Sequence, residues 1–249
     1  MSDTLVLCYH AVSERWPAEL SLTPDRLERQ LAFLVARGYR GATFGEAVIS
    51  PPAARTVAVT FDDGYRSVIE RALPILSSLG LPGTVFVATS FIGTKAPMAW
   101  PGIDHWLGSP HEPELTPMSW DDLAALCDAG WEVGSHSRTH PRLTGVDDDT
   151  LAEELRGSRA ECEAGLDRRC HSLAYPYGDH DERVIEFARR AGYRFAATVD
   201  RWHNPAPLRW PRTGIYHADH FPRFRLKASP RVRRIRAVRL TSLLPGRRA

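Results

Sequence analysis

Val57-Ala58-Val59-Thr60-Phe61, followed at once by Asp62-Asp63-Gly64, is the stretch around which the fold is organised. β-branched and aromatic residues fill the first run, which is typical of a buried strand. Asp-Gly is a common turn signal, so the simplest interpretation of the second run is a turn. We therefore predict a strand that ends in two adjacent carboxylates.

Strands and helices are predicted to alternate on both sides of this stretch. Further strand-like runs lie at 5–9, 84–88, 131–134, 172–175 and 195–199. Helical spacing of apolar residues or capping signals predict helices after Thr23-Pro24, up to Gly80, from Ser119 to Gly130, at 150–164 and at 181–191. The alternation is typical of βα units and predicts a single α/β domain with a largely parallel sheet. A Pro- and Gly-rich segment, 93–117, is predicted to be a long insertion or lid loop.

The composition is that of an ordinary globular chain: of 249 residues, 43% are hydrophobic and 25% are charged. Four cysteines lie far apart without C-x-x-C spacing, so we expect thiols in a reducing compartment rather than a disulfide framework or a zinc ribbon. Residues 1–12 carry neither a basic segment nor a sustained apolar run, and no stretch of about 18 apolar residues occurs. We expect no signal peptide, no membrane span and a cytoplasmic location.

The near-neutral formal charge of +2 conceals two parts of opposite sign. Residues 221–249 contain ten Lys and Arg and no acid, which leaves a formal charge of −8 on residues 1–220. We expect a body over 1–228 and a basic tail over 229–249 that is either disordered or an amphipathic segment on an anionic membrane. Membrane contact at the inner face would suit a lipid-linked substrate. No recognition motif accompanies the charge, so nucleic acid is not expected as a partner.

Two groups of polar residues follow predicted strands, where parallel α/β folds place their sites. Of the adjacent Asp62 and Asp63, one could bind a metal while the other accepts a proton. His136-Ser137-Arg138-Thr139-His140 has a spacing that would place both imidazoles on one face of a helical turn, although a lone histidine is more often a packing or surface residue. Two imidazoles and one carboxylate form a three-ligand set that leaves room for water and substrate, which favours a catalytic site.

The third group is Tyr175-Pro176-Tyr177-Gly178, which by itself could be an aromatic turn that packs a loop. In order and spacing, 60–64, 136–140 and 175–178 together resemble the leading motifs of the polysaccharide deacetylase family, carbohydrate esterase family 4, whose members share the nodulation-deacetylase homology domain. The resemblance covers roughly residues 5–215.

This resemblance implies a distorted (β/α) barrel of about seven parallel strands and a metal-dependent hydrolase. Its substrate would be an N-acetylated saccharide or glycolipid, with metal-bound water attacking the acetyl carbonyl; an ester carbonyl could be attacked by the same groups. The family pattern makes Asp62 the general base and Asp63, His136 and His140 the ligands of a divalent metal, usually Zn²⁺. The main-chain N–H of Tyr177 would stabilise the oxyanion. No protein partner is predicted.

Two departures from the family pattern concern proton transfer. Ala174 stands where the family has an arginine that steadies the catalytic aspartate, and no C-terminal Leu-x-x-His segment supplies the usual acid. Leu7-Cys8-Tyr9-His10-Ala11-Val12 resembles the N-terminal Tyr-His strand of a permuted branch, which makes His10 the predicted acid, with His217 and His220 as alternatives. Arg212 either replaces the missing guanidinium or forms a surface pair.

Two other functions stay open on the residues alone. The missing arginine and the missing C-terminal histidine would suit a catalytically silent barrel that binds metal and carbohydrate. Two histidines and one carboxylate also form the facial triad of non-haem Fe(II) oxygenases, although such an enzyme does not need a second carboxylate beside its ligand. Tryptophans such as Trp100 and Trp106 are assigned to packing.

Overall fold

The computed structural model describes residues 3–49, 55–199 and 205–233. The strands are β1 (Asp3–Tyr9), β2 (Ala11–Val12), β3 (Ser21–Leu22), β4 (Arg40–Ala42), β5 (Arg55–Phe61), β6 (Gly83–Val87), β7 (Glu132–Ser135), β8 (Ser172–Ala174), β9 (Phe195–Thr198), β10 (Trp210–Pro211) and β11 (Thr213–Gly214). The α-helices are α1 (Pro24–Val35), α2 (Phe44–Ile49), α3 (Leu73–Ser78), α4 (Trp120–Asp128), α5 (Asp148–Leu166), α6 (Glu182–Arg190) and α7 (Phe221–Ala228).

The strands form a nearly closed parallel barrel, as predicted. Eight of them follow one another in the order β10-β9-β8-β7-β6-β5-β1-β11, and β4 pairs with β5 beside this path. The two ends of this path, β10 and β11, are consecutive in the chain. β10 pairs with β9 through Trp210 and Ala197, and β11 pairs with β1 through Thr213 and Leu7, so one short segment joins both ends of the path. If β10 and β11 are counted as one interrupted strand, the expected number of about seven is met. Arg212 is the residue at the interruption.

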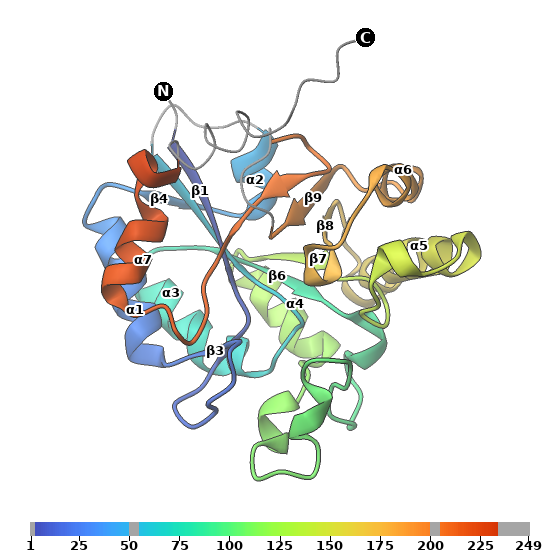
Figure 1. The fold of residues 1–249 in the computed structure, drawn as a ribbon, viewed down its shortest axis with the longest axis horizontal. Coiled ribbons are helices and arrows are strands. Elements are labelled where there is room, and N and C mark those ends of the chain that lie inside the picture. Colours follow the sequence, from blue (N-terminus) through green and yellow to red (C-terminus); the bar gives the residue numbers. More distant parts are fainter. Residues whose placement is uncertain (1–2, 50–54, 200–204, 234–249) are drawn as a thin grey trace, which may run out of the picture.

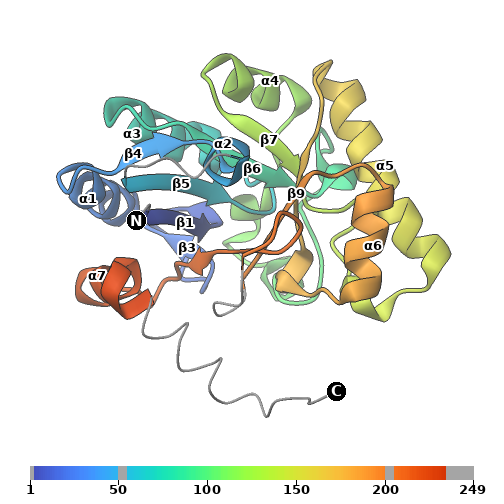
Figure 2. The same cartoon turned by 90° about the horizontal axis from the view of Figure 1, so that it is seen from above.

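The helices pack around the outside of the barrel, as Figure 2 shows from above. Local side chains close the first turns of three of them: Ser119 and Asp122 form a reciprocal capping box on α4, and Asp147 and Asp181 cap α5 and α6. The main hydrophobic core lies between these helices and the outward-facing strand residues. Because side chains alternate along a strand, the other half of the strand residues point into the barrel.

The barrel interior is a second, smaller core of mostly small side chains packed around Phe86, among them Ala58, Ala174 and Ala197. Helix α2 covers one end of it, where the ring of Phe44 meets that of Phe86 at a centroid distance of 5.5 Å. The carboxylate of Glu132 accepts a hydrogen bond from the N–H of Gly45 at 2.8 Å and thereby holds the start of α2. Among the described residues, the interior at the N-terminal end of the barrel is therefore filled, which leaves the C-terminal end of the interior for a site.

The predicted strands and the three helices predicted with both boundaries begin and end within two residues of the observed ones. The sequence patterns missed β2, β3, β4, α2, α7 and the segment of β10 and β11, all of which are short. The helix predicted to end near Gly80 begins instead with a π-helical turn, Val68–Ala72. Pro74 explains the widening, because it has no N–H to donate and its ring would clash with the carbonyl of residue 70 in an α-helix.

The predicted insertion 93–117 leaves the barrel after β6 and lies beyond the C-terminal end of β1, in the lower part of Figure 1. It contains two short 3₁₀ turns, Asp104–Trp106 and Glu112–Leu115. Of the expected basic tail, residues 234–249 lie outside the described residues. Among the described residues, no helix is both long and apolar enough to cross a membrane. All four cysteines are free thiols.

Candidate active site

Six of the residues singled out by the sequence motifs lie where strands end, on one side of the barrel. His10 follows β1, Asp62 and Asp63 follow β5, His136 and His140 follow β7, and Tyr177 lies in the turn after β8. The four central side chains are almost completely buried: Asp62, Asp63, His136 and His140. Parallel strands bring their C-terminal ends together, so a site assembles from segments that are distant in sequence.

Asp62 is held by a fork of two hydrogen bonds from Arg212. Nη1 donates to Oδ1 at 2.6 Å and Nη2 donates to Oδ2 at 2.7 Å. Cys8 adds a third contact, because its thiol donates to Oδ2 at 3.4 Å. Burial by itself would raise the pKa of Asp62, but the charge and hydrogen bonds of Arg212 outweigh it and lower that pKa well below its usual value. Asp62 is therefore an ionised carboxylate with a fixed orientation.

The fork decides between the two interpretations of Arg212: it is a buried partner of Asp62 and not a surface pair. Its position between β10 and β11 points the side chain into the barrel, where it also donates to the hydroxyl of Thr60 at 3.0 Å. Ala174, at the position of the family arginine, packs in the interior core. A guanidinium is thus present beside the aspartate, but it comes from the closing segment rather than from the strand that carries the third motif.

Asp63, His136 and His140 offer three ligand atoms that lie within 4.8 Å of one another. Oδ1 of Asp63 is 3.5 Å from Nε2 of His136 and 3.4 Å from Nε2 of His140. This oxygen is buried and has no hydrogen-bond partner among the described residues. A buried carboxylate oxygen without a donor is costly, and a cation would satisfy it. Two imidazoles and one carboxylate are ligands that Zn²⁺ takes, so the residues fit a divalent metal.

The two histidines are oriented by different contacts. Nδ1 of His136 is 2.8 Å from the carbonyl oxygen of Ala174, so that this nitrogen donates and Nε2 is left as the ligand atom. Burial lowers the pKa of His136 to about 4, which keeps the ring neutral near pH 7. His140 has no such anchor among the described residues, because its Nδ1 is buried and unpartnered. Its ring instead stacks on that of Trp100 at a centroid distance of 4.2 Å.

One local prediction about this pair is wrong. The histidines do not lie on a helical turn: residues 136–140 form an irregular loop in which Ser137 and His140 have positive φ angles of 63° and 64°. The loop is stabilised by hydroxyl groups, since Ser137 Oγ accepts from the N–H of His140 at 3.2 Å and Ser135 Oγ accepts from the N–H of Ser137 at 3.1 Å. The chain folds back on itself there, and the two rings meet at a centroid distance of 4.8 Å.

Tyr177 lies at the rim of this group. Its φ of 59° is in the left-handed region, and hydrogen bonds from the N–H groups of Gly178 and Asp179 close the turn around it. The ring packs edge-on against His140 at 4.7 Å, and the hydroxyl donates to the carbonyl of Pro101 in the insertion at 3.0 Å. The side chain thus joins the insertion to the metal-ligand group, while its backbone N–H remains the predicted oxyanion donor.

Of the three candidate acids, only His10 belongs to the side-chain group around Asp62. Together with Cys8 it offers ligand atoms within 4.8 Å of an oxygen of that carboxylate. His217 and His220 are exposed, and Nδ1 of His217 lies 3.3 Å from the carbonyl oxygen of Ser21 instead. The geometry places His10, and neither alternative, beside the predicted base.

The sequence motifs missed three residues of the site. Cys8 could have been found by strand alternation, because it shares the inward side of β1 with His10. Tyr65 is fully buried near Asp63, and burial together with that charge raises the pKa of its hydroxyl. Trp100 was assigned to packing, and it does pack, but against a predicted metal ligand. No local sequence pattern indicates that Tyr65 lies near Asp63 or that Trp100 packs against His140.

Fold and site together define a (β/α) barrel protein with a carboxylate and a candidate metal-ligand group at the C-terminal ends of its strands. The model of the polysaccharide deacetylase family matches residues 50–196, and the chain therefore belongs to the polysaccharide deacetylase family. The family predicted from the three motifs is confirmed. The matched range contains all three motifs but neither His10 nor Arg212, so the placement of those two rests on the structure.

Individual relatives are distant. YxkH of Bacillus subtilis (strain 168) is 24% identical over 200 residues, which cover 78% of this chain and 64% of that protein. Poly-beta-1,6-N-acetyl-D-glucosamine N-deacetylase of Staphylococcus aureus (strain MSSA476) is 21% identical over 192 residues, which cover 72% and 61%. The chain thus spans about three fifths of the length of these relatives.

The fold is shared with a solved structure, that of Streptococcus pyogenes deacetylase PplD in complex with acetate. The TM-score is 0.74 at 21% identity, and the alignment covers 91% of this chain and 98% of that one. At this level of identity the likeness shows the fold alone. It extends beyond the family match to nearly the whole described barrel.

Proposed function

We propose that this protein hydrolytically removes an acetyl group from an N-acetylated saccharide or glycoconjugate and that it uses a divalent metal, Zn²⁺, to do so. The observation that carries the proposal is the ionised, forked Asp62 directly beside the group of Asp63, His136 and His140. When bound by that group, the metal would polarise the acetyl carbonyl and lower the pKa of a coordinated water from about 16 towards 7.

The protein's own groups then handle the protons. Asp62 accepts the proton of the attacking water, and Arg212 fixes which of its lone pairs is free to do so. His10, on the adjacent strand end, donates a proton to the leaving nitrogen. The N–H of Tyr177 donates to the oxygen that becomes negative as the tetrahedral intermediate forms, and this interaction strengthens with the developing charge.

Two features speak against the alternative functions. A catalytically silent barrel has no need for a buried fork that keeps Asp62 ionised, and Arg212 supplies the guanidinium whose absence at Ala174 suggested such a barrel. An Fe(II) oxygenase does not need that second carboxylate beside its ligands. Zinc-dependent acetate release without oxygen or a 2-oxoacid would separate the hydrolase from the oxygenase.

The deciding experiment combines elemental analysis with acetate release from a panel of N-acetylated saccharides that includes poly-β-1,6-N-acetylglucosamine, the polymer in the name of the Staphylococcus aureus relative. The parent protein and a His136→Ala/His140→Ala variant are compared, with His217→Ala/His220→Ala as the matched control at exposed histidines. We expect about one metal ion per chain, lost with the activity only in the first variant. Metal binding unaffected by that variant would overturn the proposed site.

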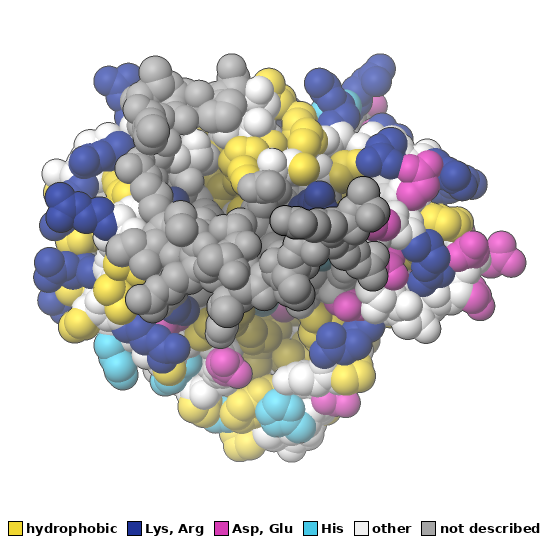
Figure 3. Space-filling view, turned by 45° about the horizontal axis from the view of Figure 1, so that its top comes forward, with side chains coloured by type: hydrophobic (Ala, Val, Ile, Leu, Met, Phe, Trp, Pro, Cys, Tyr) yellow, Lys and Arg dark blue, Asp and Glu magenta, His cyan; other side chains and the backbone are white. Residues whose placement is uncertain are grey.

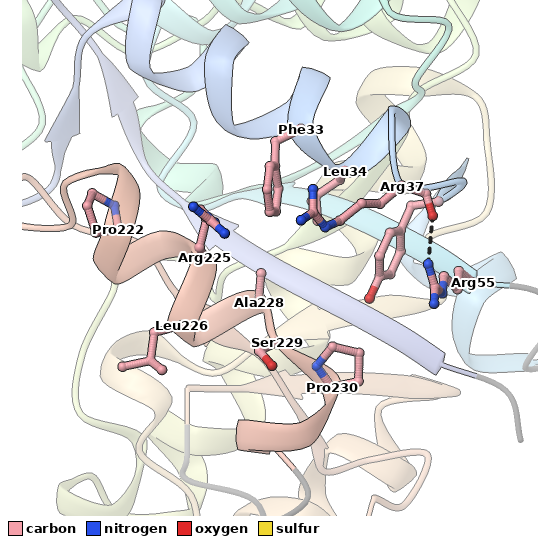
Figure 4. Close-up of a pocket in the computed structure, with 11 residues that line it drawn as sticks. Phe33, Leu34, Arg37, Arg55, Pro222, Arg225, Leu226, Ala228, Ser229 and Pro230 are labelled. Carbon is pink, nitrogen blue, oxygen red and sulfur yellow. Dashed lines mark hydrogen bonds between the residues drawn. The ribbon is translucent and has the colours of Figure 1, made fainter.

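We further propose that the protein works in the cytoplasm, in contact with an anionic membrane. The free thiols suit a reducing compartment. A groove of about 470 Å³ between α1 and α7 is lined by Arg37, Arg55 and Arg225 and by no acidic residue. Figure 4 shows Arg37 and Arg225 approaching Phe33, with their guanidinium carbons 3.8 Å and 5.6 Å from its ring centroid. Lys and Arg side chains follow the left side of Figure 3, where these helices lie.

The position of this groove bears on the substrate. Arg55 begins β5 and Asp62 follows its end, so the groove and the site lie at opposite ends of the barrel, roughly 20 Å apart along the strand. A membrane bound at the groove would leave the site facing away, which favours a saccharide outside the bilayer over one anchored in the same leaflet.

Sedimentation with phosphatidylglycerol vesicles tests this contact. Arg37→Gln/Arg225→Gln and deletion of 229–249 should each reduce binding, at about 1 kcal/mol per arginine removed from the surface. Arg168→Gln, at an exposed arginine on another side, is the control. Unchanged sedimentation of both variants would show that neither the groove nor the tail binds the membrane.

A further inference from the structure

A second group of metal-ligating side chains lies beside the site already described. Cys8 and His10 are two residues apart on and just after β1, so their side chains share the inward side of the strand, and Asp62 follows the neighbouring strand β5. The thiol, an imidazole nitrogen and a carboxylate oxygen lie within 4.8 Å of one another. The proposed reaction uses Asp62 and His10, but it leaves the Cys8 thiol without a task.

The chemistry of this group selects one class of ion. A thiolate sulfur, an imidazole nitrogen and a carboxylate oxygen bind Zn²⁺, Co²⁺ and Cd²⁺, whereas Mg²⁺ and Ca²⁺ require oxygen ligands. Nδ1 of His10 is buried and has no hydrogen-bond partner among the described residues. Sγ of Cys8 already points at Oδ2 of Asp62, 3.4 Å away. Three protein ligands leave a fourth position for water.

We propose that Cys8, His10 and Asp62 form a second, inhibitory site for a zinc-class cation. On binding, the Cys8 S–H proton passes to solvent, a sulfur–metal bond forms, and no oxidation or reduction takes place. The ion binds the lone pairs with which Asp62 would otherwise accept a proton and His10 would otherwise carry one. The inhibition therefore rests on the proposed deacetylase function, while the binding itself does not.

The second site is weaker than the Asp63, His136 and His140 group for two reasons. Arg212 already donates to both oxygens of Asp62 and places a positive charge next to the incoming cation. The Cys8 thiol is fully buried and must lose its proton before it can act as a ligand. The site is therefore filled only when metal exceeds one equivalent.

Cobalt titration of the full chain tests the binding. The first equivalent of Co²⁺ should bind without a sulfur ligand, and the second should produce a thiolate-to-cobalt charge-transfer band in the near ultraviolet. Cys8→Ser should abolish the band while retaining the first equivalent, because a serine hydroxyl can still donate to Asp62 but is a poor metal ligand. Cys127→Ser, at a half-buried thiol elsewhere, should keep the band. A band that persists in Cys8→Ser, or none in the parent, overturns the proposal.

Acetate release at increasing Zn²⁺ tests the inhibition. The rate of each protein is divided by its own rate at one equivalent of Zn²⁺. We expect the Zn²⁺ concentration that halves this rate to rise at least tenfold in Cys8→Ser and to stay unchanged in Cys127→Ser. Equal inhibition of both variants overturns the inhibitory role. If no protein releases acetate but the cobalt band still depends on Cys8, the proposed function fails and the second metal site stands.

Discussion

Arg212 reaches across the barrel from the closing segment and binds both carboxylate oxygens of Asp62, a residue 150 positions earlier in the chain. Both side chains are almost fully buried, at 0% and 3% exposure. The contact links the closure of the barrel to the ionisation of its predicted base, because Arg212 interrupts the last strand and also supplies the positive charge that pairs with Asp62.

The fork predicts how activity depends on pH. In Arg212→Met the burial that raises the pKa of Asp62 remains, but the charge that lowers it is gone. We expect the acidic limb of the kcat/KM profile to move to higher pH and activity at pH 7 to fall by about 10- to 100-fold. Arg212→Lys, which keeps the charge but not the fork, should retain the limb near its original position. An unchanged profile in Arg212→Met would show that Arg212 does not control this carboxylate.

The same pair should contribute to stability. Removing Arg212 leaves Asp62 buried without its partner, which costs about 3 to 5 kcal/mol of unfolding free energy. Because the folded pKa of Asp62 lies below the unfolded value of about 4, this contribution is complete at neutral pH and is lost only as pH falls below that value. In Arg212→Met the folded pKa of Asp62 is raised instead, so the variant loses stability as pH rises above about 4. Urea unfolding should therefore give a larger difference between parent and Arg212→Met at pH 8 than at pH 5; the same difference at both pH values would contradict this.

Stacking on Trp100 is predicted to hold His140 as a ligand. Since His140 has no hydrogen-bond anchor on Nδ1 among the described residues, Trp100→Ala should weaken zinc binding by about 10- to 100-fold, whereas Trp100→Phe should largely preserve it. Trp106→Ala, in the same insertion, is the control for general disturbance of that segment. Competition with a chromogenic chelator measures the affinity, and equal losses in Trp100→Ala and Trp106→Ala would mean that stacking is not the cause.

The identity of the acid can be tested by alanine substitution. His10→Ala should lower kcat by at least about 100-fold, because the leaving nitrogen then lacks a positioned proton donor. His217→Ala and His220→Ala should retain the parent rate, since both histidines are exposed and lie outside the group around Asp62. A large loss in either of these, with His10→Ala active, would reassign the acid.

Burial of His136 predicts a pH effect on the metal-free protein. Its pKa is about 4 in the folded state against about 6.5 unfolded, so the unfolded chain binds the proton first as pH falls. Stability is therefore full above pH 6.5 and is lost between about pH 6.5 and 4, by an amount on the order of 3 kcal/mol. Urea unfolding across this range measures the loss, and His136→Gln should show a shallower dependence. The same slope in both proteins would exclude His136 as its source.

Local patterns were enough to predict much of the fold. The β-rich run at 57–61 and its counterparts gave the parallel strands to within two residues, because apolar periodicity and caps act between near neighbours. The motif residues Asp62, Asp63, His136 and His140 were expected at strand ends, and the structure brings them together there. The family follows from these residues, and the family match agrees.

What the sequence by itself determined is the alternation of the main strands and helices along the chain, the family and the residues of the candidate site. Tertiary structure decided how the barrel closes and which residues surround the carboxylates. A two-residue strand such as β10 has too little periodicity to be recognised, and the shape of the His136–His140 loop depends on hydroxyl contacts. Arg212 could be matched to Asp62 only in three dimensions, because a contact across 150 residues leaves no local pattern and is created by closure of the barrel.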